Sequence, residues 1–416
     1  MEDRLLKNRL GYFLLFMVSI LYIGCYYPCF YNQFLLSEGF IGPKNCIFLS
    51  VIWAFFLFVF RKNKKICYPS PRFNKALVCL FFYLLFRVLF FNEESSISYI
   101  NTIFVSWLLV FLNINTFTEK EYMGSLSKLL ILMFISTLVG MALFLIFGGL
   151  PILGDIEINV EGHHILNFGF FFIKFGETWD MELIRPSGWF DEPGSFANVV
   201  LFFLIYNRLK IRSRKLELIL LIGGCLSLSM AYFIIAVLYV LFFMMRKKDI
   251  GKFLLMIGVL FVFYVSRPQE GLLYNIWDYS FGRMERIVEG NDGSRDYNYA
   301  FKAFEKYYLT GQNDEIIKKE FEGITLETIW FTLANHGIVG ILFYYIPFLL
   351  VFLNTIGSKI VKKDKKKDNI LLLILLGVNL LQRPIYLFPL YILLIYYIWF
   401  DDERISSGVT NQIKIH

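Results

Sequence analysis

The chain has 416 residues, of which 57% are hydrophobic, 19% aromatic and only 18% charged, with a formal net charge of +7. Soluble domains carry roughly a quarter charged residues, whereas here short charged clusters separate long apolar runs. This composition excludes an ordinary soluble domain, and the lack of polar–apolar alternation argues against a transmembrane β-barrel. We expect an all-α polytopic membrane protein that contacts membrane lipids and binds no nucleic acid.

Apolar runs of about the 20 residues that a helix needs to cross a bilayer recur along the chain. We predict about twelve spans in one polytopic domain over residues 1–416, the first of them long enough to remain as a span rather than a cleaved signal peptide. The predicted spans lie near residues 11–30, 44–60, 75–91, 99–116, 127–149, 194–208, 216–230, 231–245, 252–266, 328–354, 369–382 and 385–400.

Basic clusters beside the spans predict the orientation, because Lys and Arg favour the cytoplasmic side. The clusters are the N-terminus and the segments that begin at Arg61, Arg208, Arg246 and Lys359. All fall on one side if about twelve spans are counted. The segment 216–245 has basic flanks at both ends, so we expect two short spans there, joined near Leu226 to Met230. Both termini are then cytoplasmic.

Two long segments, residues 150–193 and 267–327, are predicted to lie on the outer side. Loops of this length are usually functional or disordered, and their many aromatic residues argue against disorder. In the second loop, the residues with helical spacing are Ala300, Phe301, Phe304, Tyr307 and Tyr308. We expect a helix from an N-cap at Ser294 to a stop at Gly311, lying on the membrane surface or packed on the bundle.

The stretch "IRPSGWFDEPGSFANVV" (184–200) holds the densest polar chemistry of the first loop. The forked donors of Arg185 suit phosphate oxygens; the alternative is an internal ion pair. Pro193 marks the start of a span. Asp191 and Glu192 therefore lie just before a helix N-terminus. They are candidates for a functional role, and the alternative is that they only compensate the helix dipole.

The second loop and the span after it contain further candidates. Arg295 lies at the expected helix N-terminus, which favours an anion, unless it pairs with a neighbouring Asp. Arg283 makes this loop locally basic. Glu327 lies at the mouth of the span in "LETIWFTLANHGIVG", where dipole compensation is the alternative, and His336 lies about 13 Å further in by helical rise.

For His336 the alternative is an interhelical hydrogen bond. Arg87 lies within an apolar run, where an arginine faces a partner or a cavity; its alternative is a structural pair. We expect no metal and no cofactor: the six cysteines lack zinc-type spacing, and His163 and His164 lack a third ligand.

Three segments together resemble the Wzy-type polymerases of O-antigen or capsule repeat units, and more widely the O-antigen ligase superfamily. "RPSGWFDEP" is similar to the family pattern at Arg185, Pro186, Gly188, Phe190, Glu192 and Pro193. "SRDYNYAFKAFEKYYLTG" resembles the second-loop motif, and "ETIWFTLANHGIVG" resembles the last one at Glu327, Trp330, Asn335, Gly337 and Gly340. Ligases usually have a histidine near the start of the last motif, where this chain has Leu326 and Glu327, which favours a polymerase.

The resemblance implies an enzyme of the bacterial inner membrane. It would transfer a growing glycan from undecaprenyl pyrophosphate to another lipid-linked repeat unit at the periplasmic face, sharing chain-length control with a partner protein. We expect Arg185 and Arg295 to hold the pyrophosphate without a metal ion, with Arg87 and Arg283 as weaker candidates.

Glu327 is the first choice of base for the acceptor hydroxyl, followed by Glu192 and Asp191. Trp189 and Tyr299 are expected to stack on sugars, with interfacial anchoring as the alternative. Two other functions stay open, a ligase and a non-enzymatic transporter or flippase.

Overall fold

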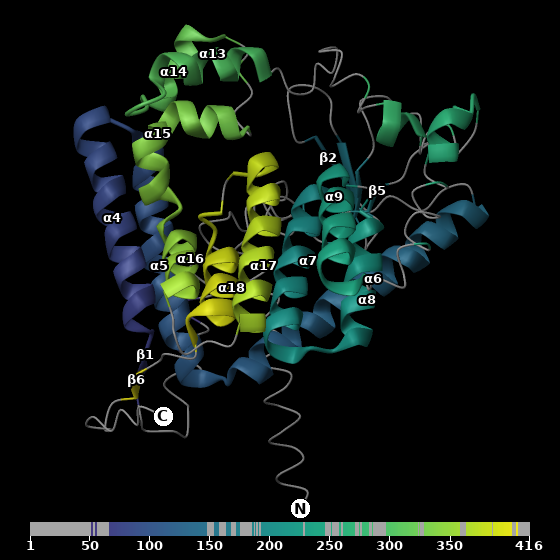
Figure 1. Cartoon of the computed structure of the whole chain (residues 1–416), viewed down its shortest axis with the longest axis horizontal. Helices are drawn as coiled ribbons and strands as arrows, with labels where there is room; N and C mark the ends of the chain where they lie inside the picture. Colours follow the sequence, from purple (N-terminus) through teal and green to yellow (C-terminus); the bar gives the residue numbers. More distant parts are fainter. Residues whose placement is uncertain are drawn as a thin grey trace, which may run out of the picture.

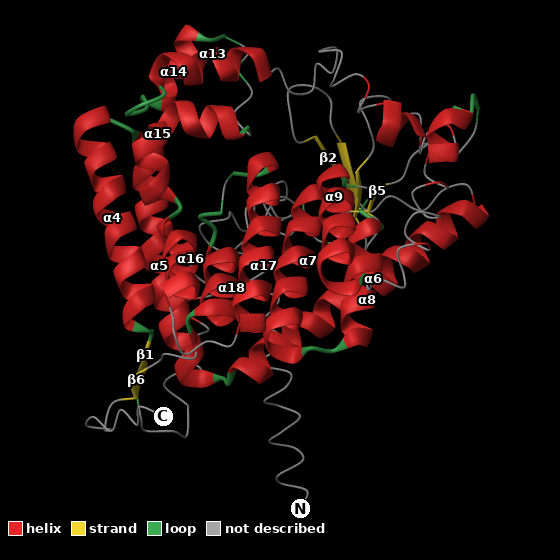
Figure 2. Ribbon diagram, in the orientation of Figure 1, coloured by secondary structure: helices red, strands yellow, loops and turns green. Residues whose placement is uncertain are grey.

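The computed structural model describes most of the chain from Ile66 onward and shows a mainly helical molecule (Figures 1 and 2). The described residues are 66–147, 188, 190, 193–227, 229–245, 261–270, 277–282, 297–322, 328–357, 363–384 and 386–401, with short strands and isolated residues outside these ranges. The spans predicted near 11–30 and 44–60 fall almost wholly outside the described residues, as does part of the span near 252–266.

Three long helices follow one another with short connections: α4 (Pro71–Phe91), α5 (Glu94–Thr116) and α6 (Glu119–Phe147). The Ser70 hydroxyl accepts a hydrogen bond from the Phe73 amide and Pro71 lies in the first turn, two features that favour a helix start. Asn92 ends α4 in the left-handed conformation, with φ of 51°. This sharp turn places Glu93 directly between α4 and α5.

A small antiparallel sheet lies in the segment predicted as the first outer loop. Its strands, in spatial order, are β2 (Gly154–Glu157), β3 (His164–Asn167), β4 (Phe172–Lys174) and β5 (Arg185–Pro186). The prediction of an all-α chain is corrected here. Hydropathy windows miss such strands because each is only a few residues long, and the sheet satisfies the backbone polar groups of a segment with no helical periodicity.

The segment after the sheet forms three successive helical stretches. Its elements are α7 (Pro193–Tyr206), the π-helix η1 (Asn207–Ile211), α8 (Arg214–Cys225), α9 (Met230–Tyr239) and the π-helix η2 (Val240–Met244). Tyr239 donates to Glu217 and Tyr232 to the Leu220 carbonyl, so α8 and α9 run antiparallel. The expected turn between two helices within 216–245 is therefore present.

The C-terminal part contains the remaining helices. They are the π-helix η4 (Asp278–Gly282), α13 (Tyr297–Tyr307), α14 (Asp314–Glu320), α15 (Ile329–Tyr344), α16 (Ile346–Gly357), α17 (Lys363–Gln382) and α18 (Pro389–Trp399). A strand at Ile405–Ser406 (β6) pairs with β1 (Cys67–Tyr68). The expected second-loop helix is thus present as α13, and Gly311 ends it with φ of 75° and an amide bonded to the Tyr307 carbonyl.

Helices α7 and α18 form the centre of the core. Every residue of α18 from Pro389 to Ile398 is buried, as are nearly all residues of α7. A helix that is apolar on every side must be covered on every side, and helices from across the sequence surround this pair. By contrast, α4 exposes Phe82 and Phe90 at 62% and 72%, which suits an apolar surround.

Three described helices are long and apolar enough to cross a membrane, or four if the pair α15–α16, bent by 43°, counts as one span. Several other predicted spans, including those near 194–208 and 385–400, are helices too short to meet that criterion. The described chain therefore has the character of a membrane protein.

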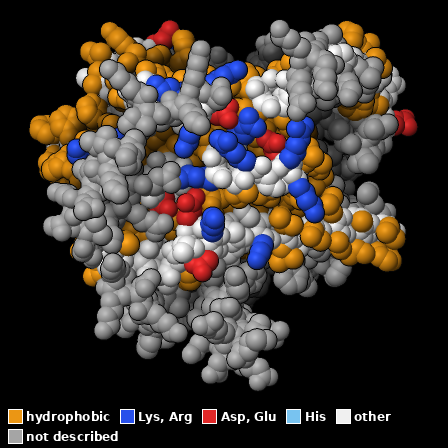
Figure 3. Space-filling view, turned by 60° about the horizontal axis from the view of Figure 1, so that its bottom comes forward, with side chains coloured by type: hydrophobic (Ala, Val, Ile, Leu, Met, Phe, Trp, Pro, Cys, Tyr) orange, Lys and Arg blue, Asp and Glu red, His pale blue; other side chains and the backbone are white. Residues whose placement is uncertain are grey.

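The bundle has two chemically different ends. We call the end with β5, α13, α14 and the start of α15 the motif end, because the family-like segments lie there (Figure 1). We call the opposite end, with β1, β6 and the starts of α8 and α17, the basic end. Lys and Arg side chains gather there (Figure 3).

Candidate functional site

The structure places three of the predicted site residues with their side chains: Arg87, Tyr299 and His336. Arg185 is described by its backbone alone, where it opens β5 and pairs with Lys174 of β4. Outside the described residues lie Arg295, Glu327, Glu192, Arg283, Asp191 and Trp189. The phosphate clamp of Arg185 and Arg295 and the choice of Glu327 as base stay predictions.

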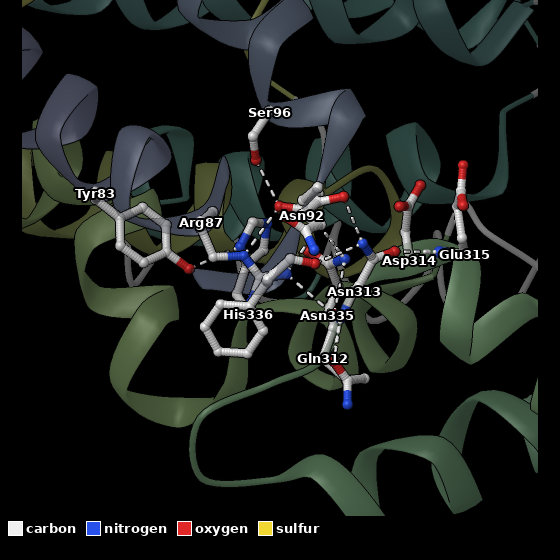
Figure 4. Close-up of polar contacts among 12 residues, drawn as sticks. Tyr83, Arg87, Asn92, Ser96, Gln312, Asn313, Asp314, Glu315, Asn335 and His336 are labelled. Atoms are coloured by element: carbon white, nitrogen blue, oxygen red, sulfur yellow. Dashed lines mark hydrogen bonds and ion pairs between the residues drawn. The ribbon is translucent and has the colours of Figure 1, made fainter. Parts of the chain in front are cut away.

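A buried polar cluster at the motif end joins α4, α5 and α15 (Figure 4), and its residues bond to the Glu93 carboxylate. Arg87 donates to both carboxylate oxygens of Glu93, from Nε to Oε2 at 2.9 Å and from Nη2 to Oε1 at 2.8 Å. Ser96 Oγ donates to Oε2 at 2.5 Å, and Asn335 Nδ2 to Oε1 at 2.6 Å. We call Tyr83, Arg87, Glu93, Asn335 and His336 the Glu93 junction.

Arg87 and Glu93 are each 1% exposed, so their ion pair is closed to solvent. A bidentate arginine–carboxylate pair with further hydrogen bonds is the arrangement that makes a buried charge tolerable. Burial alone would raise the pKa of Glu93, but the hydrogen bonds and charge of Arg87, with the hydrogen bond from Ser96, hold that pKa below its ordinary value of 4.5. Glu93 is therefore ionised at neutral pH, and for Arg87 the structural pair is what the structure shows.

The junction also holds the chain that leaves α13. Arg87 Nη2 donates to the Gln312 carbonyl at 3.0 Å, and Asn335 Nδ2 approaches the same oxygen at 3.2 Å. Asn313 Nδ2 donates to the carbonyls of Phe91 and Asn92 at 2.7 and 2.9 Å. The contacts from Arg87 and Asn313 tie segments more than two hundred residues apart in the sequence. They fix where α13 and α14 sit above the ends of α4 and α5.

A break in α15 makes this attachment possible. Gly337 has φ of 68° and ψ of 170°, which is not helical, so nearby backbone groups lose their partners within the helix. The segment after α13 supplies replacements: Ile338 N donates to the Tyr308 carbonyl at 2.7 Å, and Gln312 N donates to the Asn335 carbonyl at 3.0 Å.

Glycine is required on both sides of this contact. A Cβ at Gly337 would lie 2.5 Å from the Gly311 nitrogen, and one at Gly311 would lie 2.0 Å from the Asn335 oxygen. Both residues also have positive φ, which favours glycine. Two glycines from separate motif-like segments thus meet backbone to backbone.

His336 links α15 to α4 deeper in the bundle. Its Nδ1 lies 2.8 Å from the Tyr83 hydroxyl, and its ring stacks on Tyr344 at 4.3 Å between centroids. Gly340 leaves room for this bond, since a Cβ there would lie 2.3 Å from the Tyr83 oxygen. The interhelical hydrogen bond is therefore present, and Gly340, which has no side chain, permits this close contact between α15 and α4.

Helix α13 packs on the first turn of α15 and presents Tyr299 outward. Phe301 and Phe304 contact Trp330 with ring centroids 4.9 and 5.4 Å apart. Tyr299 is 42% exposed, and Lys302 Nζ lies 5.7 Å from its ring centre. The ring of Tyr299 is thus accessible, and its stacking on a sugar stays a prediction.

A second polar cluster, which contains none of the predicted site residues, lies where α7 begins. The guanidinium of Arg383 lies so close to Gly194 that a Cβ there would be 2.5 Å from Nη2, and Nη1 is 3.4 Å from Ser195 Oγ. One turn further in, Asn198 bonds to Tyr391 and Asn379, each at 2.6 Å. We call Gly194, Ser195 and Arg383 the Arg383 junction.

The Arg383 junction places a cation directly after the first motif-like segment. The sequence signal was present, because Arg383 precedes a proline between two predicted spans on the outer side. Nothing in the sequence, however, indicates that Arg383 and Gly194 lie side by side.

No family model matches the chain, and the comparisons with curated proteins and with solved structures also found no match. The evidence for function is therefore the arrangement itself. The Glu93 junction is closed to solvent, so its residues are suited to holding α13 and α15 in place. The Arg383 junction and the exposed face of α13 lie at the same end of the bundle as β5.

Proposed function

We propose that this protein is a metal-independent glycosyltransferase of the Wzy type, which polymerises oligosaccharide repeat units carried on undecaprenyl pyrophosphate. The observation that supports the proposal is that the described parts of the family-like segments, far apart in sequence, lie at the motif end, with the basic residues of η1, α8 and the start of α17 at the opposite end (Figures 1 and 3). By the positive-inside rule the motif end is then periplasmic, in a multi-pass protein of the bacterial inner membrane with cytoplasmic termini.

The reaction needs a cationic site for the departing pyrophosphate and a base or orienting group for the acceptor hydroxyl. Arg185, at the start of β5, and Arg295, just before α13, are the proposed phosphate ligands. Glu327, just before α15, is the proposed base. The Glu93 junction supports the reaction indirectly, because it holds α13 and α15 against α4 and α5.

The test is complementation of a strain that lacks the gene, with the length of the surface glycan as readout. Arg185→Ala and Arg295→Ala are each expected to abolish chain growth at normal protein level, and Glu327→Gln to be more damaging than His336→Ala. Arg267→Ala is the matched control, since this arginine is 61% exposed and pairs with Glu285 outside the motif-like segments. Normal glycan length in either arginine variant would overturn the clamp.

Products in the deletion strain separate the polymerase from its alternatives. A lost polymerase leaves single repeat units on the final lipid, whereas long polymer accumulating on the carrier indicates a lost ligase. Purified protein that binds lipid-linked repeats without lengthening them would support a transporter and contradict the proposal.

A further inference from the structure

A cavity of about 290 Å³ opens at the basic end, far from both junctions. The side chains that line it are Asn207, Arg208, Arg212, Arg214, Glu217, Lys365 and Asp368. They come from η1, from Arg212 in the turn after it, from the first turn of α8 and from the start of α17. Four basic side chains face two acidic ones, so the lining has two positive charges in excess.

The backbone that carries three of these arginines is held rigidly. Asn207 bonds twice across the turn, accepting from the Ser213 amide at 3.1 Å and donating to the Ser213 carbonyl at 3.0 Å. Arg212 lies between them in the left-handed conformation, with φ of 59°. The Ser213 hydroxyl caps α8 by accepting from the Leu216 amide at 3.3 Å. The loop is thus preorganised and does not depend on a ligand for its shape.

The two acids of the cavity are both directed at Arg208. Its Nη1 lies 3.7 Å from Glu217, its Nε lies 3.3 Å from Asp368, and its guanidinium lies 4.7 Å from the Phe243 ring centre. Its Nε is nevertheless buried without a hydrogen bond. Tyr239 also donates to Glu217, and among the described residues neither acid forms an ion pair with Arg212, Arg214 or Lys365.

The other three basic side chains, Arg212, Arg214 and Lys365, are exposed and have no side-chain ion pair or hydrogen bond within the part of the chain that the structure describes. Three cations that converge on one hollow repel each other unless an anion lies between them. Arginine forks and a lysine ammonium are the donors that phosphate oxygens prefer.

We propose that this cavity binds a phosphate group, from either an anionic lipid headgroup or a soluble phosphate compound, on the face opposite the motif end. A phosphate with a small attached group fits the volume, and the rigid turn presents donors from two helices to it. Such a site would anchor or regulate the protein from the basic side, independently of the proposed glycan chemistry.

The test uses the full chain and a matched pair of double variants. Arg212→Gln/Lys365→Gln removes two cations from the cavity. Lys215→Gln/Lys367→Gln removes two exposed cations from neighbouring positions of α8 and α17, outside its lining. The net charge falls equally in both.

Calorimetric titration of pyrophosphate into detergent-solubilised protein measures the soluble ligand. Native mass spectrometry of protein from nanodiscs of phosphatidylglycerol or phosphatidylcholine measures the lipid. In whichever arm the wild type binds, the cavity variant is expected to lose about tenfold or more in affinity or lipid occupancy, and the control variant to stay within about twofold.

The arm that binds identifies the source of the phosphate. Binding in neither arm, or an equal loss in both double variants, would overturn the proposal, because a general basic surface does not distinguish the two pairs.

Discussion

Glu93→Gln tests the Glu93 junction most directly, because it removes one charge and keeps the shape of the side chain. The substitution leaves the Arg87 guanidinium 1% exposed with no counter-charge. Breaking a buried ion pair from one side costs about 3–5 kcal/mol. A glutamine amide also has only one acceptor oxygen, whereas the two Glu93 oxygens accept from Arg87, Ser96 and Asn335. The loss of unfolding free energy is therefore expected towards the upper end of that range.

Glu94→Gln is the matched control, since Glu94 is the exposed neighbour at the start of α5. It loses a favourable interaction with the helix dipole of at most about 1 kcal/mol. The double variant Arg87→Met/Glu93→Leu removes both charges and is expected to be more stable than Glu93→Gln alone, because no unpaired charge remains.

The assay is thermal unfolding of the detergent-purified protein followed by tryptophan fluorescence. The expected order of melting temperatures is wild type close to Glu94→Gln, then the double variant, then Glu93→Gln. Equal melting temperatures for Glu93→Gln and Glu94→Gln would refute the claim that the pair holds the motif end together.

The pH dependence follows from the same pair. The pKa of Glu93 is lowered in the folded protein, so the stability that it contributes is fully present above about 4.5 and is lost as pH falls through its lower folded value. Wild type should therefore lose melting temperature more steeply than Glu93→Gln below that pH, and parallel curves would contradict the assignment.

Three further variants probe the other contacts. Gly337→Ala should lower stability by about 1–3 kcal/mol through backbone strain alone. Gly377→Ala is the control, because an added Cβ there has nothing within 4 Å, and it should keep or raise the melting temperature. Equal melting temperatures for the two variants would contradict the requirement for glycine at the break in α15. Gly194→Ala should displace the Arg383 guanidinium, which lies beside the end of the first motif-like segment, and shorten the glycan at a nearly unchanged melting temperature. Glycan of full length would show that the position of Arg383 does not affect chain growth. Tyr83→Phe should cost about 1–3 kcal/mol by leaving a buried His336 nitrogen unpaired, measured by the same unfolding assay, and no change would mean that this bond contributes nothing.

Local signals in the sequence were sufficient for several of the described helices. The spacing of Ala300, Phe304 and Tyr307 predicts α13, and Gly311 ends it as expected. The basic flanks of 216–245 predict a turn that the structure contains between α8 and α9. These predictions succeed because periodicity and turn chemistry act over a few residues.

Tertiary structure alone decided which polar residues meet. Arg87 was recognisable as a costly arginine in an apolar run, but its partner Glu93 lies across a tight turn, and Asn335 reaches the same carboxylate from 242 residues away. Likewise, Arg383 covers Gly194 from 189 positions further along the chain. Average hydropathy records how apolar a segment is and carries no information about such pairings, because they depend on how whole helices pack.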